Sequence, residues 1–370
     1  MSHLRAIIFL CCWSLTVSAA DSSWTEKWSL KGDFRFRNEQ IKDGANSSGT
    51  SMTETEQNRH RLRARITANG KVNEAVETTF RLATGSSAST GATSTNQDFD
   101  EYTAKKTFNL DMAYANWQAR PTANVWIGKS PVPYYAPGTS DLLLDADVTV
   151  EGISYKEVCK GDSLTTFWNI GYSILNEQHN STTPTSVADV MMNGADIGVI
   201  VGMGDAKVTA GLGNLSFPSI KESVTPSAKG NSLTGTTYTY DYRLTRGFLE
   251  ISGPLFGGPV ALFVDYAKNA DAPEDNTAQL VGIKIGKAKE VGDLLFAVDY
   301  RELKKDSTVG ILAESDGAGG GTDTKSTRYN LQYQLDKGVN VALSYYDGKR
   351  AVSTLDIPYK RAMLDFGFAF

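Results

Sequence analysis

The sequence has few residues of the kinds that build metal centres, disulfides and hydrolytic triads. Its 370 residues include only three cysteines and three histidines. Cys11 and Cys12 lie in an apolar N-terminal segment, so Cys159 stands alone beyond it and has no partner for an intrachain disulfide. His60 and His179 lack an evident serine partner. These shortages leave almost no candidates for a His or Cys metal site or for Ser-His-acid catalysis, so no enzyme, cofactor or metal is predicted.

Long apolar runs are also missing after the N-terminus. No segment beyond it approaches the roughly 18 consecutive apolar residues of a transmembrane helix, which excludes helical spans. Residues 1–20 combine a basic residue, Arg5, an apolar run and small residues that end in Ala20. This pattern is typical of a secretory signal peptide, with cleavage expected after Ala20. Residues 21–370 contain no linker and are predicted to form one domain.

What the sequence has in abundance is an alternation of apolar and polar residues with a period of two. The pattern is clearest in residues 28–37, 60–69 and 328–346. It places apolar side chains on one face of a strand and polar ones on the other, whereas helical spacing is poor. The sequence thus predicts sixteen strands, near 27–40, 58–69, 75–85, 107–119, 123–130, 147–158, 163–175, 191–203, 206–215, 238–252, 259–268, 278–286, 293–303, 326–336, 339–347 and 358–370.

The connections between these strands are sorted by length. Seven short turns alternate with eight long polar segments, at 41–57, 86–106, 131–146, 176–190, 216–237, 269–277, 304–325 and 348–357. Transmembrane barrels have short periplasmic turns and long external loops, whereas a soluble sandwich has no reason for this sorting. An all-β transmembrane antiparallel barrel is therefore predicted. The count of sixteen could change by two near 123–158 and 238–252, where the alternation slips.

Aromatic residues support a bilayer-facing surface. The final strand carries Leu364, Phe366, Phe368 and Phe370 on one face, which suits lipid contact, although a soluble sandwich could also end this way. The ending resembles the C-terminal strand of bacterial outer-membrane barrels, so Phe366, Phe368 and Phe370 are expected to act as an assembly signal. Many other Trp and Tyr residues are predicted near strand ends or on the outer face, where interfacial preference or plain β-propensity accounts for them. Trp126, Tyr242 and Tyr359 are among these.

Basic residues are concentrated on the polar face of the first three predicted strands. Adjacent strands are only about 4.8 Å apart, so these side chains form one positive patch that needs water or counter-charge. A solvated face with no transport role is the alternative, and the net charge of −5 argues against nucleic acid. Sixteen strands enclose a lumen too wide for side chains to fill. The basic residues predicted to line it are Lys31, Arg35, Arg37, Arg59, Arg61, Arg63, Arg65 and Arg81.

The third long segment, 131–146, differs from the other loops because it is apolar and rich in proline. Tyr134, Tyr135 and residues 142–144 would be buried if this loop folds inward against the barrel wall. Asp141 and Asp145 would then face the arginines across the narrowest part of the pore, and the field between them would discriminate among ions. A loop that folds over the rim or meets a neighbouring subunit is the alternative.

Together, these features resemble those of Gram-negative general porins, and most closely the putative-porin group of proteobacteria. The resemblance covers residues 21–370, although the Pro-Glu-Phe-Gly-Gly loop motif of the enteric proteins is not found. It implies a sixteen-stranded barrel, usually a homotrimer, whose third loop narrows the lumen. Asp141 and Asp145 would be the acidic loop residues. The basic wall carried over from the family would be Arg35, Arg37, Arg61, Arg63, Arg65 and Arg81.

The function expected from this resemblance is passive diffusion of small hydrophilic solutes and ions across the outer membrane of a Gram-negative bacterium. The expected partners are outer-membrane lipid, lipopolysaccharide and the barrel-assembly machinery. A channel selective for an anionic solute, such as phosphate or an organic acid, is the first alternative. A surface receptor or adhesin, in which the loops are the active part, is the second.

Overall fold

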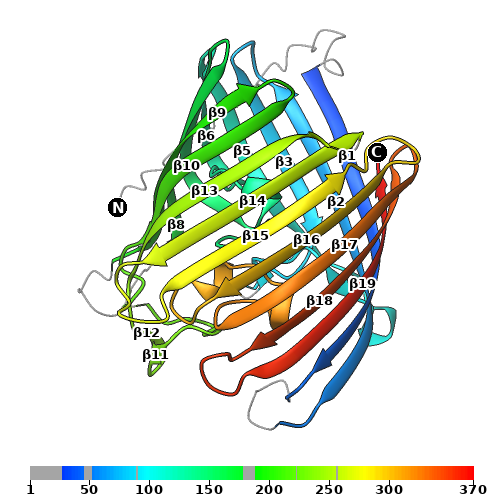
Figure 1. Ribbon diagram of the computed structural model, residues 1–370, viewed down its shortest axis with the longest axis vertical. Helices are drawn as coiled ribbons and strands as arrows, with labels where there is room; N and C mark the ends of the chain where they lie inside the picture. The colour runs from blue at the N-terminus through cyan, green and yellow to red at the C-terminus, as the bar shows by residue number, and fades with distance from the viewer. Residues whose placement is uncertain (1–26, 46–51, 89–90, 178–187, 222, 256) are drawn as a thin grey trace, which may run out of the picture.

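The computed structural model describes residues 27–45, 52–88, 91–177, 188–221, 223–255 and 257–370. Within these ranges, sixteen long antiparallel strands form one closed barrel (Figure 1). The strands are β1 Trp28–Asp43, β2 Thr55–Lys71, β3 Val76–Thr84, β5 Phe108–Arg120, β6 Ala123–Pro131, β7 Thr149–Lys160, β8 Leu164–Asn176, β9 Val190–Met203, β10 Ala206–Phe217, β13 Tyr242–Leu255, β14 Gly258–Asn269, β15 Thr277–Gly286, β16 Leu294–Leu303, β17 Thr324–Asp336, β18 Val339–Arg350 and β19 Ile357–Ala369.

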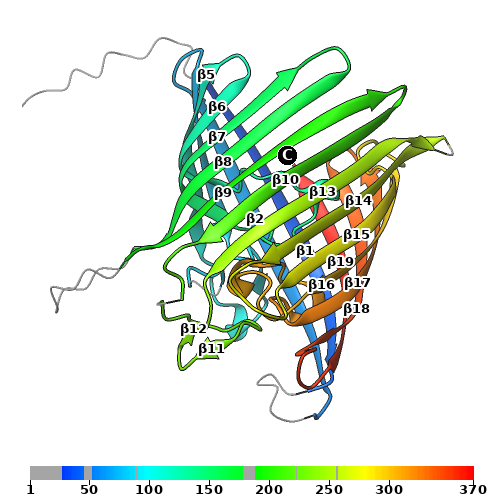
Figure 2. The ribbon, with the colours of Figure 1, turned by 60° about the vertical axis from the view of Figure 1, so that its left-hand side comes forward.

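The predicted number and order of the long strands are confirmed, and the two ends of the barrel differ as expected. Figure 2 shows the long loops gathered at the end opposite the short turns. The largest boundary error is at β13, which begins at Tyr242 and not at Tyr238, because Tyr238 belongs to the two-residue strand β12, Thr237–Tyr238. The expected signal peptide, residues 1–20, lies outside the described residues.

Short elements occupy the long loops. The two-residue strand β4, Gln97–Asp98, pairs with β2, while β11, Leu233–Thr234, pairs with β12. The 3₁₀ turns are η2 Glu101–Thr103, η3 Pro137–Thr139, η4 Gly310–Leu312 and η5 Gly317–Gly319. In the part of the chain that the structure describes, no helix has the length and apolar character needed to cross a membrane.

The alternation along each strand sorts side chains between an apolar outer face and a polar inner face. In β14, Leu262 and Val264 are exposed on the outside and alternate with Phe263 and Asp265, which are buried. An apolar outer surface is what a lipid environment requires. Of the aromatic residues predicted near strand ends or on the outer face, Tyr242 and Tyr359 lie near the starts of β13 and β19 but not on the outer face, and an outer-face position is wrong for Trp126. Tyr242 and Tyr359 are buried on inward positions, and Trp126 faces inward because the next residue, Ile127, is exposed on the outer face.

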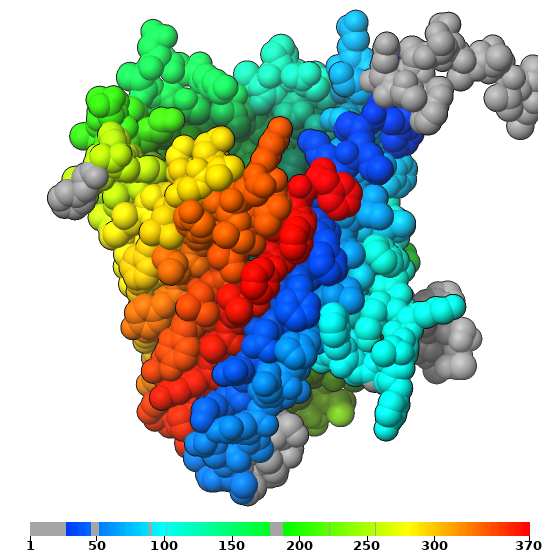
Figure 3. Space-filling model, turned by 90° about the vertical axis from the view of Figure 1, so that its right-hand side faces the viewer, coloured from blue at the N-terminus to red at the C-terminus, as the bar shows by residue number. Residues whose placement is uncertain are grey.

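The first and last strands close the barrel. Figure 3 shows β19 running beside β1 along the outer surface. At the short-turn end, the Gly32 amide donates to the Phe370 carbonyl at 2.9 Å, and the Phe370 amide donates to the Gly32 carbonyl at 3.0 Å. The Phe370 ring lies where a side chain at position 32 would project, so the absence of a Cβ at Gly32 makes this closure possible.

Candidate functional site

The basic residues predicted from the sequence lie on neighbouring strands and face the same side of the sheet. Arg35 is directly opposite Arg63 in the β1–β2 register, and Arg37 is opposite Arg61. The basic wall, as we call this surface, consists of Lys31, Arg35, Arg37, Arg59, Arg61, Arg63, Arg65 and Arg81 on β1, β2 and β3. Because like charges lie close together on the basic wall, they require negative charge nearby.

Carboxylates on β1 and on the neighbouring strands supply most of that negative charge. Asp33 pairs with Arg63 and Arg65, each at 2.8 Å, and Glu39 pairs with Arg59 at 3.0 Å. Asp98 in β4 lies 2.6 Å from Arg61, and Asp111 in β5 pairs with Arg81. Bidentate pairing holds Arg37 on Asp365, with the donors Nε and Nη2 at 2.7 and 2.8 Å.

Two members of the basic wall are less compensated. The nearest carboxylate oxygen to Arg35 is Asp365 Oδ2 at 3.8 Å, and Arg35 donates a hydrogen bond to Asn96 at 2.5 Å. Lys31 has no ion pair among the described residues. Arg35 and Lys31 both lie toward the short-turn end of β1, so the positive charge of the wall is least balanced there.

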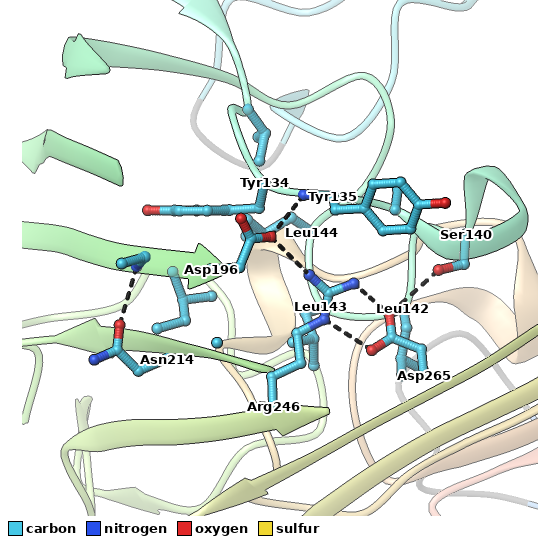
Figure 4. Close-up of a pocket in the computed structure, with 15 residues that line it drawn as sticks. Tyr134, Tyr135, Ser140, Leu142, Leu143, Leu144, Asp196, Asn214, Arg246 and Asp265 are labelled. Atoms are coloured by element: carbon cyan, nitrogen blue, oxygen red, sulfur yellow. Dashed lines mark hydrogen bonds and ion pairs between the residues drawn. The ribbon is translucent and has the colours of Figure 1, made fainter. Parts of the chain in front are cut away.

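The third long loop is attached to the inward face of the barrel by hydrogen bonds to carboxylates of other strands (Figure 4). The Tyr135 amide donates to Asp196 of β9 at 2.7 Å, and the Gly138 amide donates to Glu250 of β13 at 2.7 Å. The Ser140 hydroxyl donates to Asp265 of β14 at 3.3 Å. Backbone amides of the loop are thus satisfied by carboxylates that strand alternation directs inward.

Aromatic and apolar contacts complete the attachment of this loop. The Tyr135 ring stacks on Phe167 and Phe248, with ring centroids 5.3 and 5.1 Å apart. The Tyr134 ring covers Gly171 and Gly194, which face each other on β8 and β9. A Cβ at Gly194 would lie 2.6 Å from the Tyr134 hydroxyl oxygen, so glycine at this pair makes room for the ring. Residues 142–144 pack in the apolar cluster inside the barrel.

The neighbours of the two predicted acidic loop residues differ from the expectation. Asp141 pairs with Arg301 of β16 at 2.9 Å and not with the basic wall. Asp145 accepts hydrogen bonds from the amides of Asp147 and Ser315, at 2.9 and 3.0 Å. The expectation failed because the lumen-facing partner of a loop residue depends on how the loop crosses the barrel, which strand alternation does not encode.

Sequence reasoning missed a second inserted loop, residues 304–323, which contacts both the third loop and the strands. Its Leu312 carbonyl accepts from the Asp145 amide at 2.8 Å, and its Glu314 lies 3.4 Å from Arg301. Asp316 pairs with Arg361 of β19 at 3.0 Å and lies 3.8 Å from Arg37. Asp316, together with Asp147 at the end of the third loop, which lies 3.8 Å from Arg65, therefore supplies the loop carboxylates beside the basic wall that had been assigned to Asp141 and Asp145.

Arg301 and Arg361 were also missed, although a signal for them exists. Both are buried on inward positions of their strands, where the alternation of β16 and β19 would have placed them. Arg361 pairs with the fully buried Glu39 of β1 at 2.5 Å. Arg301 is shared among Asp141, Asp299 and Glu314. Alternation could thus have found the strand residues of the site, but not the loop that joins them.

The described residues contain no group of three or more His, Cys, Asp or Glu side chains that could hold a metal ion. What they provide is an ionic inner surface with two loops attached to it. Such a surface can orient and select charged solutes by its field, without a cofactor.

Comparison with solved structures finds the same fold in outer-membrane barrels. OprB of Pseudomonas putida matches with a TM-score of 0.60 and 11% identity, covering 94% of this chain and 95% of that one. OmpF of Salmonella typhi, solved with daunomycin, matches with a TM-score of 0.53 and 13% identity, covering 93% and 97%. At these identities the likeness concerns the fold alone.

Sequence comparison identifies the family. No curated protein matches the chain. Residues 41–247 match the model of a family described as putative porin. This match covers more than half of the 370 residues. The chain therefore belongs to the putative porin family of outer-membrane channels.

Proposed function

We propose that the protein is a general diffusion porin, through which small hydrophilic solutes and ions cross the outer membrane. The observation that carries this proposal is the closed barrel of sixteen long strands whose inward positions are polar and charged. A barrel of this size encloses more space than strand side chains can fill. No chemical step is assigned to it, and its selectivity comes from the charges that line the path.

The path is narrowed by the third loop and by residues 304–323, which reach the basic wall through Asp316. Support comes from the contacts of the third loop with inward side chains of β9, β13, β14 and β16. The contacts of residues 304–323 with Arg301, Arg361 and Arg37 add to it. Each of the seven arginines in the wall has a carboxylate oxygen within 3.8 Å. We therefore expect only a weak preference for anions, because most of the positive charge is balanced locally.

The proposal extends to biogenesis and assembly. Residues 1–20 direct export across the inner membrane of a Gram-negative bacterium and are removed. The C-terminal residues Phe366, Phe368 and Phe370 are read by the barrel-assembly machinery, and the finished barrel is a homotrimer surrounded by lipid and lipopolysaccharide. The apolar outer face supports the lipid contact, while the trimer follows from the family resemblance.

A channel selective for an anionic solute is the second candidate. It is favoured by the incomplete compensation of Arg35 and Lys31, which leaves donors available toward the short-turn end. Saturable block of the ion current by one anion would support this candidate, whereas a linear dependence on concentration would support general diffusion.

Single-channel recording of the refolded protein under a KCl gradient tests the proposal. We expect a stable open conductance with weak chloride preference, and a shift of the zero-current potential toward potassium when Arg61, Arg63 and Arg65 are replaced by Gln. The shift follows because the replacement removes three positive charges from the lumen wall and leaves Asp33 unpaired, while Asp98 keeps only Arg59 at 3.4 Å.

The matched control removes three positive charges outside the basic wall, with Lys42, Lys325 and Lys349 replaced by Gln. These lysines are exposed and pair with loop or strand-end carboxylates at the long-loop end. An equal shift in both triple variants would mean that net charge, and not the basic wall, sets selectivity. Folded, inserted protein without conductance would overturn the porin proposal itself.

A further inference from the structure

A second surface of the lumen, on the strands that follow the basic wall, carries aromatic rings and a lysine. The Tyr114 ring of β5 lies beside the Trp126 ring of β6, with centroids 5.7 Å apart and an angle of 50° between their planes. The Lys156 ammonium of β7 stands 4.7 Å from the centroid of the Trp126 ring. We call Tyr114, Asn116, Trp126 and Lys156 the aromatic ledge. All four side chains are half-buried.

The strand register places these residues on the inner face. Asn116 is directly opposite Trp126 in the β5–β6 register. Lys156 is opposite Asn169 of β8, which is buried and belongs to the inward face. The neighbouring residue Ile127 is exposed on the outer face, with 48% of its surface accessible. A solute in the lumen can therefore reach the ledge from one side.

Lys156 lacks the partners that a half-buried ammonium group normally has. Among the described residues, it makes no ion pair and no hydrogen bond. Asp196, whose charge favours the ammonium form, is already engaged by the Tyr135 amide, Asn169 and Arg246. Removing a charge from water without a partner is costly. The face of Trp126 offsets only part of that cost.

The side chain of Asn116 lacks a hydrogen-bond donor among the described residues, just as Lys156 lacks an acceptor. Its side-chain oxygen is buried and accepts no hydrogen bond from the described residues. A buried acceptor without a donor is destabilising. The ledge therefore presents an unpaired cation and two aromatic faces on adjacent strands, with an unsatisfied acceptor buried beside them, which is more than β-propensity or packing requires.

We propose that the aromatic ledge binds aromatic carboxylates, as a step in their passage through the channel. The solute carboxylate pairs with Lys156, and its ring stacks on Tyr114 and Trp126. The inference rests on the proposed channel function and names a solute class for it. Binding is non-covalent, and the aromatic contact separates this solute class from small anions that the basic wall attracts by charge alone.

Current block in planar bilayers tests the inference, with 4-hydroxybenzoate as the probe and acetate as the small anion. We expect 4-hydroxybenzoate to block the KCl current saturably, at a half-blocking concentration at least tenfold below that of acetate. Lys156→Gln and Trp126→Leu each raise the half-blocking concentration at least tenfold. Lys156→Arg keeps the charge and retains most of the block.

Lys129→Gln is the matched control, because Lys129 is on the neighbouring part of β6 but pairs with Glu151 on the outer face. It should leave the block unchanged. Equal half-blocking concentrations for the two probes on the wild-type channel would overturn the inference without any variant. So would an unchanged block in Lys156→Gln at normal KCl conductance. Absence of KCl conductance in the wild type would instead contradict the proposed channel.

Discussion

At the scale of single residues, Glu314 is a carboxyl group whose charge depends strongly on its surroundings. Its side chain is 3% exposed and lies 3.4 Å from Arg301. Burial raises the pKa of Glu314 to about 7, although Arg301 opposes the shift, while Asp141 and Asp316 add to it. A raised pKa means that the neutral form stabilises the packed loop fully below the ordinary pKa of 4.5. That contribution is lost as the pH rises through about 7.

The raised pKa of Glu314 predicts that the ion selectivity of the channel depends on pH. As the pH falls from 8 to 6, Glu314 takes up a proton, so the lumen gains about one positive charge and the zero-current potential moves toward chloride. Glu314→Gln should abolish the shift, because its side chain does not titrate. The measurement is the zero-current potential under a KCl gradient at both pH values.

His60→Gln is the control for this pH dependence, because His60 is the only histidine among the described residues. The His60 ring stacks on Phe36 with centroids 5.7 Å apart, and both face the outside of the barrel. Its replacement should leave the shift intact. A Glu314→Gln variant that keeps the full shift would show that another group is responsible.

At the scale of elements, the two inserted loops show what composition can predict. Tyr134, Tyr135 and residues 142–144 marked the third loop as one that needs burial. Residues 304–323 are rich in Asp, Ser and Gly, as an exposed loop would be. Their burial depends on hydrogen bonding, since Asn231 donates to the Lys305 and Thr308 carbonyls at 2.9 and 2.8 Å. Composition alone cannot distinguish a solvated polar loop from one whose polar groups are satisfied by other loops.

The second inserted loop yields a prediction about channel noise. Asp316 connects it to Arg361 and Arg37. Asp316→Asn should weaken this connection by about 1.5 kcal/mol, the low end for a hydrogen bond to a charged group, because the Asp316 side chain is 32% exposed. The released loop would then be roughly tenfold more populated. Single-channel traces should show more frequent excursions to higher conductance.

Asp271→Asn is a matched control for that variant. It removes the same charge from another long loop, where Asp271 pairs with the exposed Arg243 at 2.6 Å. Its traces should resemble the wild type. If Asp316→Asn shows no more excursions than Asp271→Asn, residues 304–323 are held by their backbone contacts, and the Asp316 carboxylate does not control the loop.

At the scale of the whole molecule, local patterns predicted the strand order well and the contacts across the lumen poorly. Strand alternation and loop length are properties of neighbouring residues, so they predicted one basic patch on β1 and β2, whereas the pairing of Arg35 with Arg63 and of Arg37 with Arg61 comes from the strand register. Contacts such as Asp141 with Arg301 join residues 160 positions apart. They depend on strand stagger around the closed barrel, which no local pattern specifies.

Closure of the barrel gives the last prediction, which separates assembly from stability. Phe370 is 73% exposed, and its hydrogen bonds to Gly32 use backbone atoms that alanine retains. Phe370→Ala should therefore change the unfolding free energy of the finished barrel by less than about 1 kcal/mol. Its amount in the outer membrane should nevertheless fall strongly, because under the proposed assembly route the terminal ring is recognised before the barrel closes. Quantitative blotting of membrane fractions and heat-dependent gel mobility measure the two effects separately.

Phe108→Ala provides the comparison, because Phe108 is also an exposed outer-face phenylalanine, at 48%, but lies at the start of β5. It should reach the outer membrane at wild-type levels. If both variants are depleted equally, loss of an apolar outer side chain explains the effect and Phe370 carries no special signal. If Phe370→Ala alone is depleted yet melts like the wild type, the terminal ring acts before the barrel exists, since the folded structure barely depends on it.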